Sequence, residues 1–493
     1  MKHRMIFLLL ALCACHGRAQ TDEARRAYEE FKRQAGQEYQ DFRKQANDQY
    51  AEFLKKAWTE YQILPAMPRP KHETTPPVVV PDEDRGKPIK DKPVPIDDVV
   101  PPPAPNPQPL PIGPIREDVS PKHTVVVCHY CGTEVKIRMN EASRFSLEGF
   151  DNRKIAEVWS MLSTEGMMNN TLRDCLLARM EMGLCDWAYL NLLHEFAKSV
   201  YGEGNEATLL TSYIYCQSGY KMRLAEMSGK LLLLYASRHD IFDTLCIQID
   251  GTKFFLFNCQ EEGRVYLADT AFPQEQPLSL FVPQEQQFAF SASASRTLKS
   301  QHYPDMEVRV QVNKNLIDFY QSYPSSVVDN DFMTRWAMYA NTPLDDHVKA
   351  VLYPALQNGI KGLGQLEAAN KLIDWVQTAF DYEYDEKVWG HDRAFFAEES
   401  LYYPYCDCED RAILFSRLVR DLLGLDVVLV YYPGHLATAI RFTEDVKGDY
   451  VVINSSRFVI SDPTYIGASV GMTMKGMDNA SSTVILLQQN TGH

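Results

Sequence analysis

Three residues near the C-terminus carry side chains that could act together in acyl transfer: a thiol, an imidazole and a carboxylate. Cys408 opens the run Cys-Glu-Asp-Arg-Ala, His435 follows a Pro-Gly pair, and Asp462 precedes Pro463. A cysteine attacks a carbonyl as a thiolate, an imidazole takes up its proton, and a carboxylate orients the imidazole. Taken singly, each residue has an ordinary explanation as a buried thiol, a core histidine or a turn residue. Their order along the chain favours a triad.

The surrounding pattern predicts elements that would position these groups. Apolar residues after Cys408 recur at three- and four-residue intervals, and Gly424 supplies a stop, which predicts a helix that begins at the cysteine. The positive end of such a helix should stabilise a thiolate. Strands are expected over 426–432 and 436–442, with His435 at their edge, and over 450–454 and 458–460. Asp462 then leaves the sheet before Pro463.

These segments resemble the transglutaminase-like superfamily, whose core reads roughly C-x-D-x-A, then G-H, then D-x-T/S. The C-E-D form is similar to the bacterial transglutaminase-like cysteine peptidases, and the likeness covers about residues 345 to 470. It implies an α+β fold with a papain/transglutaminase-like core, in which a nucleophile helix packs on an antiparallel sheet. It also implies the roles of nucleophile, base and orienting carboxylate for Cys408, His435 and Asp462.

The resemblance implies a cysteine peptidase or amidase that cleaves amide bonds of peptides, proteins or cell-wall peptide through a thioester. An amine acceptor in place of water would make it a transglutaminase. Because the superfamily includes members without activity, the alternative is an inactive binding or scaffold protein of the cell envelope. No cofactor or metal is expected.

Two features near the cysteine depart from the usual pattern. Cys406 stands two residues before Cys408, where it could modulate or block the nucleophile, although so short a loop would strain a mutual disulfide. Candidates for a second oxyanion donor are Tyr403, Tyr405 and Trp389. The aromatic-rich stretches around them could line a substrate cleft or simply fill a core.

The N-terminus predicts export. Residues 1–19 have a basic start and an apolar run typical of a secretory signal, cleaved after Ala19, or else a lipoprotein box that leaves Cys15 lipidated; soluble export is favoured. The protein is therefore expected in the periplasm or at the cell surface. Cys128 and Cys131 have the spacing of a metal knuckle, but a local disulfide or chance pairing is favoured over zinc. The net charge of −15 argues against nucleic-acid binding.

The N-terminal third divides by composition. Residues 20–63 carry alanines and aromatics that recur every eleven residues from Ala24 to Gln62, which predicts one amphipathic helix. It should dock on the chain's own globular body or mediate self-association or contact with an envelope partner, in preference to a membrane surface. Residues 64–121 form a Pro-rich linker, expected to be an extended spacer.

The rest divides into an α+β unit over 122–300, a bridging segment over 301–344 and the transglutaminase-like domain over 345–493. The first unit contains a helix pattern from Ala207 to Gly219 that matches the one from Ala412 to Gly424 in length. Aligning the alanines places Glu203 opposite Cys408. The first unit is therefore either a degenerate copy without its nucleophile, used for packing or substrate binding, or a generic helix-Gly-strand unit.

Overall fold

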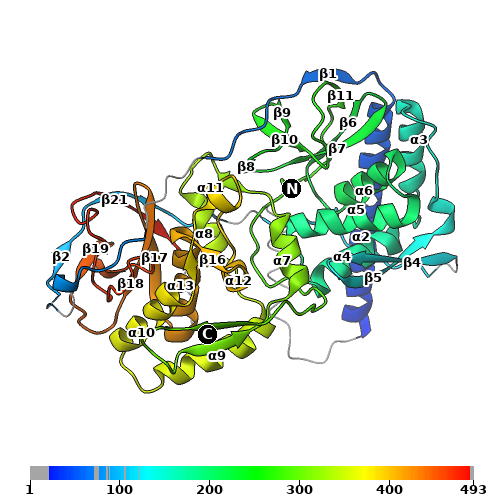
Figure 1. The fold of residues 1–493 in the computed structure, drawn as a ribbon. Helices are drawn as coiled ribbons and strands as arrows, with labels where there is room; N and C mark the ends of the chain where they lie inside the picture. The colour runs from blue at the N-terminus through cyan, green and yellow to red at the C-terminus, as the bar shows by residue number, and fades with distance from the viewer. Residues whose placement is uncertain are drawn as a thin grey trace.

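The computed structural model describes residues 22–70, 77–84, 87, 89–104, 107–119 and 122–488. The chain is mixed α+β, with 35% helix and 26% strand, as the sequence predicts. Two large sheets lie in different parts of the molecule, each with its own helices (Figure 1). The expected signal peptide, with Cys15, lies outside the described residues. Among the described helices, none combines the length and the apolar character needed to cross a membrane.

The first sheet has six antiparallel strands in the order β1-β11-β6-β7-β10-β9. Their bounds are β1 Thr59–Gln62, β6 Met222–Met227, β7 Lys230–Ala236, β9 Cys246–Ile249, β10 Thr252–Leu256 and β11 Arg264–Ala268. Both faces of β6 and β7 are buried, because helices cover one face and a small apolar cluster fills the other.

Helices flank the first sheet, and α6 covers the helix pattern expected from Ala207. They are α3 Asn152–Leu162, α4 Asn169–Glu181, α5 Asp186–Tyr201 and α6 Asn205–Gln217. Asp151 starts α3 by accepting hydrogen bonds from the N–H groups of Arg153 and Lys154. The hairpin of β4 His123–Tyr130 and β5 Thr133–Asn140 packs on α4 and α5.

The second sheet has seven strands in the order β2-β19-β20-β18-β17-β21-β3. Their bounds are β2 Lys92–Pro93, β3 Ile96–Val100, β17 Asp426–Tyr432, β18 His435–Arg441, β19 Asp449–Ile453, β20 Ser456–Ser461 and β21 Ser482–Leu486. The five central strands are antiparallel, while β2 and β3 join the edges in parallel. Short apolar runs rich in β-branched residues explain the four strands predicted from sequence.

Helix α13, Cys408–Leu423, is the centre of the second unit. It packs on β17 and β18 and is covered by α8 Thr334–Asn341, α10 Gln365–Thr378 and α12 Ala397–Tyr402. Every residue from Cys408 to Arg420 is buried. A helix enclosed on all sides can hold its first residue in a fixed position, away from water.

The N-terminal helix is shorter than predicted. Helix α2 spans Asp22–Leu54, and the expected continuation to Gln62 is wrong, because Thr59–Gln62 forms β1 and pairs with β11. The C-terminal half of α2 docks on the chain itself: Tyr50 and Leu54 are buried, and α2 packs on α3. Phe31, nearer the start, is half exposed.

The Pro-rich segment is not a free spacer. Its described parts add β2 and β3 to the second sheet, and Leu64 and Met67 bridge to residues of the first unit. Prolines tolerate sheet edges, where no N–H is needed on the open side. The described parts of this segment therefore contact both units and tie them together (Figure 1).

The segment 301–344 does more than bridge. β14 Ser326–Val328 pairs with β8 His239–Ile241 of the first unit, and α8 packs on α13 of the second.

The remaining elements are β12 Arg296–Lys299, β13 Glu307–Val310, α7 Lys314–Gln321, α9 Asp346–Ile360, β15 Asp381–Tyr382, α11 Asp385–Val388 and β16 Tyr405–Cys406, with short 3-10 turns at Asp82–Asp84 and Glu141–Ser143. One apolar cluster runs from Ala46 to Leu487 and joins both units.

Candidate active site

Cys408 is the first residue of α13, as the sequence predicts. Asp407 caps the helix: its carboxylate accepts a hydrogen bond from the Glu409 N–H at 3.1 Å, and its own N–H donates to Asp410 Oδ2 at 3.2 Å. Gly424 ends the helix in the left-handed conformation, with φ of 65°. The cap at Asp407 fixes where the helix begins, and it therefore fixes the position of the Cys408 sulfur atom.

The histidine and the aspartate come from neighbouring strands. β17 and β18 are joined by a two-residue turn in which Gly434 has φ of 78°, and His435, the first residue of β18, pairs with Tyr432 across the hairpin. Asp462 follows the last residue of β20. The Gln377 side chain donates to the carbonyl oxygen of Asp462 at 3.0 Å, which holds the loop after the strand in place.

A hydrogen bond joins the imidazole to the carboxylate. His435 Nε2 lies 2.8 Å from Asp462 Oδ2, while Asp462 Oδ1 accepts from the N–H groups of Thr464 and Tyr465 at 2.9 and 3.2 Å. Nδ1 of His435 has no hydrogen-bond partner within the part of the chain that the structure describes. The carboxylate therefore orients the ring through Nε2 and leaves Nδ1 as the nitrogen that can accept a proton.

The Cys408 thiol is enclosed and uncharged in this arrangement. Burial is the main cause that holds the pKa of the thiol well above its usual range. The neighbouring carboxyl groups of Asp407 and Glu409 raise this pKa further, whereas the Leu436 N–H lowers it. Desolvation is the largest influence on the thiol and favours its neutral form, which is opposite to the thiolate expected at the start of the helix. Cys408 and His435 are 0% exposed and Asp462 is 2% exposed.

Tyr382 lies near the Cys408 thiol, and α8 packs on the helix that the thiol begins. The Tyr382 phenol interacts electrostatically with the Cys408 thiol, and burial raises the pKa of that phenol well above its usual range. Trp336 of α8 belongs to the same apolar cluster as Cys408. Tyr382 stands in the aromatic-rich stretch before the nucleophile, but sequence alone does not separate it from its aromatic neighbours.

Five buried carboxyl groups gather beside the cysteine, and sequence reasoning missed this cluster. They are Asp385, Asp392, Asp407, Glu409 and Asp410. Burial raises the pKa of Glu409 to about 8 and that of Asp385 to about 10. The guanidinium of Arg335 binds Asp392 at 3.1 Å and Glu409 at 3.4 Å and is itself 3% exposed.

Some of these groups have the geometry of metal ligands. One oxygen from each of Asp385, Asp392 and Glu409 lies within 4.8 Å of the others, and ligand atoms of Asp407, Cys408 and Glu409 do the same. Carboxylate oxygens are the ligands that hard divalent cations prefer. The carboxylates come from three separate segments of the chain. Their spacing in the sequence therefore gave no indication of a metal site.

Cys406 does not share the surroundings of Cys408. Both are free thiols, but Cys406 packs in the cluster around α9 and α10, whereas Cys408 packs in the cluster shared with the first unit. Burial raises the pKa of Cys406 to about 12. Cys128 and Cys131 are free as well, so the local disulfide expected there is not formed.

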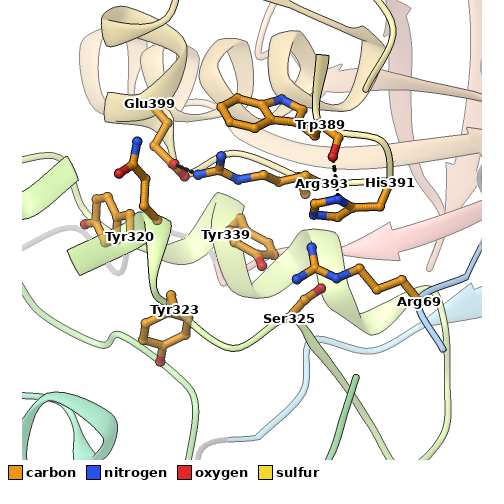
Figure 2. A pocket seen from close by; sticks show the side chains of 11 residues that line it. Arg69, Tyr320, Tyr323, Ser325, Tyr339, Trp389, His391, Arg393 and Glu399 are labelled. Atoms are coloured by element: carbon orange, nitrogen blue, oxygen red, sulfur yellow. Dashed lines mark hydrogen bonds and ion pairs between the residues drawn. The ribbon is translucent and has the colours of Figure 1, made fainter. Parts of the chain in front are cut away.

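Two of the three expected oxyanion donors lie at a different pocket: Trp389 lines it, and Tyr403 lies beside it. A pocket of about 320 Å³ lies beside the segment that leads to α12, and Trp389 lines it together with Arg393, whose guanidinium stacks 4.1 Å from the Trp389 ring (Figure 2). Tyr403 contacts the same two side chains. Arg69 reaches the pocket from the Pro-rich segment and binds Asp243 at 2.6 Å. Tyr405 belongs to β16.

A carboxylate orients the imidazole, but no hydrogen bond joins Nδ1 of His435 to the Cys408 sulfur within the described residues. Comparison with known protein families, with curated proteins and with solved structures finds no match to this chain.

Proposed function

We propose that the chain is an exported transglutaminase-like cysteine hydrolase that cleaves amide bonds in peptides, proteins or cell-wall peptide. The observation that carries the proposal is the 2.8 Å bond between His435 Nε2 and Asp462 Oδ2, with Nδ1 left without a partner among the described residues. An enclosed imidazole held in this way by a carboxylate is suited to act as a base. The helix start, the hairpin exit and the strand end that carry the three groups support a papain/transglutaminase-like core.

The proposed reaction begins with transfer of the Cys408 proton to His435 Nδ1. Asp462 stabilises the resulting imidazolium through Nε2, and the thiolate attacks the amide carbonyl carbon to give a tetrahedral oxyanion. Backbone N–H groups at the start of α13 would stabilise that oxyanion. The leaving amine takes the proton from His435, and a thioester forms. Water, deprotonated by His435, then attacks the thioester, and the product acid leaves as the thiol regains its proton.

A substrate has to open the site before this chemistry can begin. The three side chains are shielded from water, and the high pKa of the Cys408 thiol follows first from that burial. Displacement of Tyr382 would remove one of the groups around the sulfur atom. Entry of a peptide and formation of the thiolate–imidazolium pair are therefore coupled in this proposal.

The same closure favours a second candidate, an inactive transglutaminase-like binding or scaffold protein of the cell envelope. In that case the buried thiol and imidazole contribute only to packing. The two candidates differ in one property, which is whether amide hydrolysis depends on Cys408.

A turnover assay separates them. The full-length protein should be incubated with a quenched fluorescent peptide library and with cell-wall peptides, alongside the variants Cys408→Ala and His435→Ala. Hydrolysis by the wild-type chain that both variants lose supports the hydrolase. The matched control is Cys406→Ala, which removes a buried free thiol two residues away and should keep activity. Absence of cleavage of every substrate, or cleavage that survives Cys408→Ala, favours the scaffold.

A further inference from the structure

The two large sheets share one topology. After α13 the chain forms β17 to β21, which lie in the order β19-β20-β18-β17-β21; after α6 it forms β6, β7, β9, β10 and β11, which lie in the order β9-β10-β7-β6-β11. The neighbours correspond one to one, and each corresponding pair is antiparallel. Both helices pack on the first two strands that follow them. A generic helix-Gly-strand unit has no reason to repeat a five-strand order.

Individual positions correspond as well. Gly219 and Gly424, which follow the two helices, both have positive φ, and the first hairpin of each sheet has a two-residue turn that ends in a glycine. The residue after that turn is Lys230 in the first sheet and His435 in the second. The number of residues between Gly219 and Gly424 equals the number between Lys230 and His435. The same number of residues separates Glu203 from Cys408.

The third triad position has its own counterpart. The second hairpin has a two-residue turn in both sheets, β9–β10 and β19–β20. Asp462 stands six residues after the first residue of β20, and Asn258 stands six residues after the first residue of β10. Glu203, Lys230 and Asn258 therefore occupy the places of thiol, imidazole and carboxylate, but none of them can act as a thiol nucleophile or an imidazole base.

These three residues meet at one hollow. A pocket of about 180 Å³ in the first unit is lined by Glu203, Lys230 and Asn258. Three residues far apart in sequence converge there because the segment just before α6, the hairpin exit and the strand end lie together. Glu203 stands two residues before the first residue of α6, whereas Cys408 is itself the first residue of α13. The site of the second unit is closed to solvent, whereas Glu203 and Lys230 have side chains 71% and 58% exposed.

The lining of the pocket suits a short stretch of peptide. Its remaining lining residues are apolar or carry groups that can form hydrogen bonds, namely His194, Gly204, Asn205, Thr208, Thr211, Leu231, Leu232, Leu233 and Phe257. His194 Nδ1 is buried without a hydrogen-bond partner among the described residues. Opposite charges stand at the rim, Glu203 and Lys230. The volume accommodates about one amino-acid side chain, given roughly 30 Å³ for each water that it replaces.

We propose that the first unit is a non-catalytic copy of the second, and that its pocket at the vestigial site binds a peptide segment of the substrate. One apolar side chain of that segment would lie on Leu231, Leu233 and Phe257, with neighbouring polar groups facing Thr208 and His194. The assignment of the ligand as substrate rests on the proposed hydrolase function. The pocket then supplies binding to a part of the peptide that does not react.

Binding and turnover test this proposal separately. The full-length Cys408→Ala chain is screened against a display library of random heptapeptides, and the enriched peptides are titrated by fluorescence anisotropy. Thr208→Phe, which fills the pocket, and Lys230→Glu, which reverses an exposed charge at its rim, should each raise Kd at least about tenfold. Ser199→Phe, on the exposed surface of α5, is the matched control and should leave Kd unchanged.

Each outcome decides the proposal. An absence of enriched peptides, or a Kd that neither pocket variant changes, overturns it. In the chain that keeps Cys408, Thr208→Phe should raise KM with little change in kcat; hydrolysis with an unchanged KM also overturns it while leaving the hydrolase intact. Peptide binding that depends on the pocket, in a wild-type chain without turnover, refutes the hydrolase and keeps the pocket as a peptide site.

Discussion

Replacing Arg335 by methionine should destabilise the protein strongly. Its guanidinium is 3% exposed, makes two contacts with Asp392, and lies 3.4 Å from Glu409. It also stacks 4.5 Å from the Trp336 ring. Methionine keeps much of the apolar volume but removes the positive charge from two buried carboxyl groups. Breaking a buried pair in this way costs about 3–5 kcal/mol.

Thermal unfolding of the full chain at pH 7, followed by circular dichroism, measures this cost. With an unfolding entropy of about 2.1 cal/mol/K per residue over 493 residues, each kcal/mol shifts the midpoint by about 1 °C, so the midpoint should fall by about 3–5 °C. Arg33→Met is the matched control, because Arg33 pairs with Glu30 at 2.6 Å with both side chains more than half exposed, and it should leave the midpoint unchanged. Arg335→Met combined with Asp392→Asn should recover part of the loss, because Asp392 is the carboxylate that the guanidinium pairs with most closely. A midpoint for Arg335→Met equal to that of the control would refute the buried charge cluster.

Three further predictions concern the triad, the buried acids and the N-terminal helix. Asp462→Asn should lower kcat by about 10²- to 10⁴-fold with little change in the unfolding midpoint, because it alters the imidazole and not the fold; steady-state kinetics check this. Burial raises the pKa of Glu409 from 4.5 to about 8, so the folded state keeps a proton that the unfolded state has lost in that window. Stability should therefore fall as pH rises from about 5 to 8, with a slope of up to about 1.4 kcal/mol per pH unit from this group, and Glu409→Gln should flatten the midpoint's pH profile. Leu54→Ala should cost about 2–5 kcal/mol in chemical unfolding, whereas Phe31→Ala should change stability by less than about 0.5 kcal/mol, because Leu54 is buried against the first unit and Phe31 is half exposed.

The nucleophile helix and the strands around it could be predicted because their signals are local. Apolar periodicity and Gly424 define α13 from end to end, and the β-branched run defines β17. For these elements the information lies within a few residues of the feature. The pairing of His435 with Asp462 was expected from the order of the motif residues and the resemblance that they carry, because the two residues lie far apart in the sequence.

The features that sequence reasoning missed depend on contacts between distant segments. Residues 59–62 continue the eleven-residue pattern, yet they form a strand because β11 offers an unpaired edge. The Pro-rich segment has no pattern of its own that predicts β2 and β3, which form only against the second sheet. The carboxyl groups of Asp385 and Asp392 reach Glu409 from different segments, so no local pattern predicts the cluster that they form.

The most direct test of the proposed nucleophile is covalent capture. The full-length protein is treated with peptides that carry a thiol-reactive ketone, and adducts are counted and located by mass spectrometry. We expect one adduct, on Cys408, that forms at least about 100-fold more slowly in His435→Ala and at an unchanged rate in Cys406→Ala. Equal rates in the wild-type and His435→Ala chains, or adducts on other cysteines in place of Cys408, would contradict the assignment of Cys408 as the nucleophile.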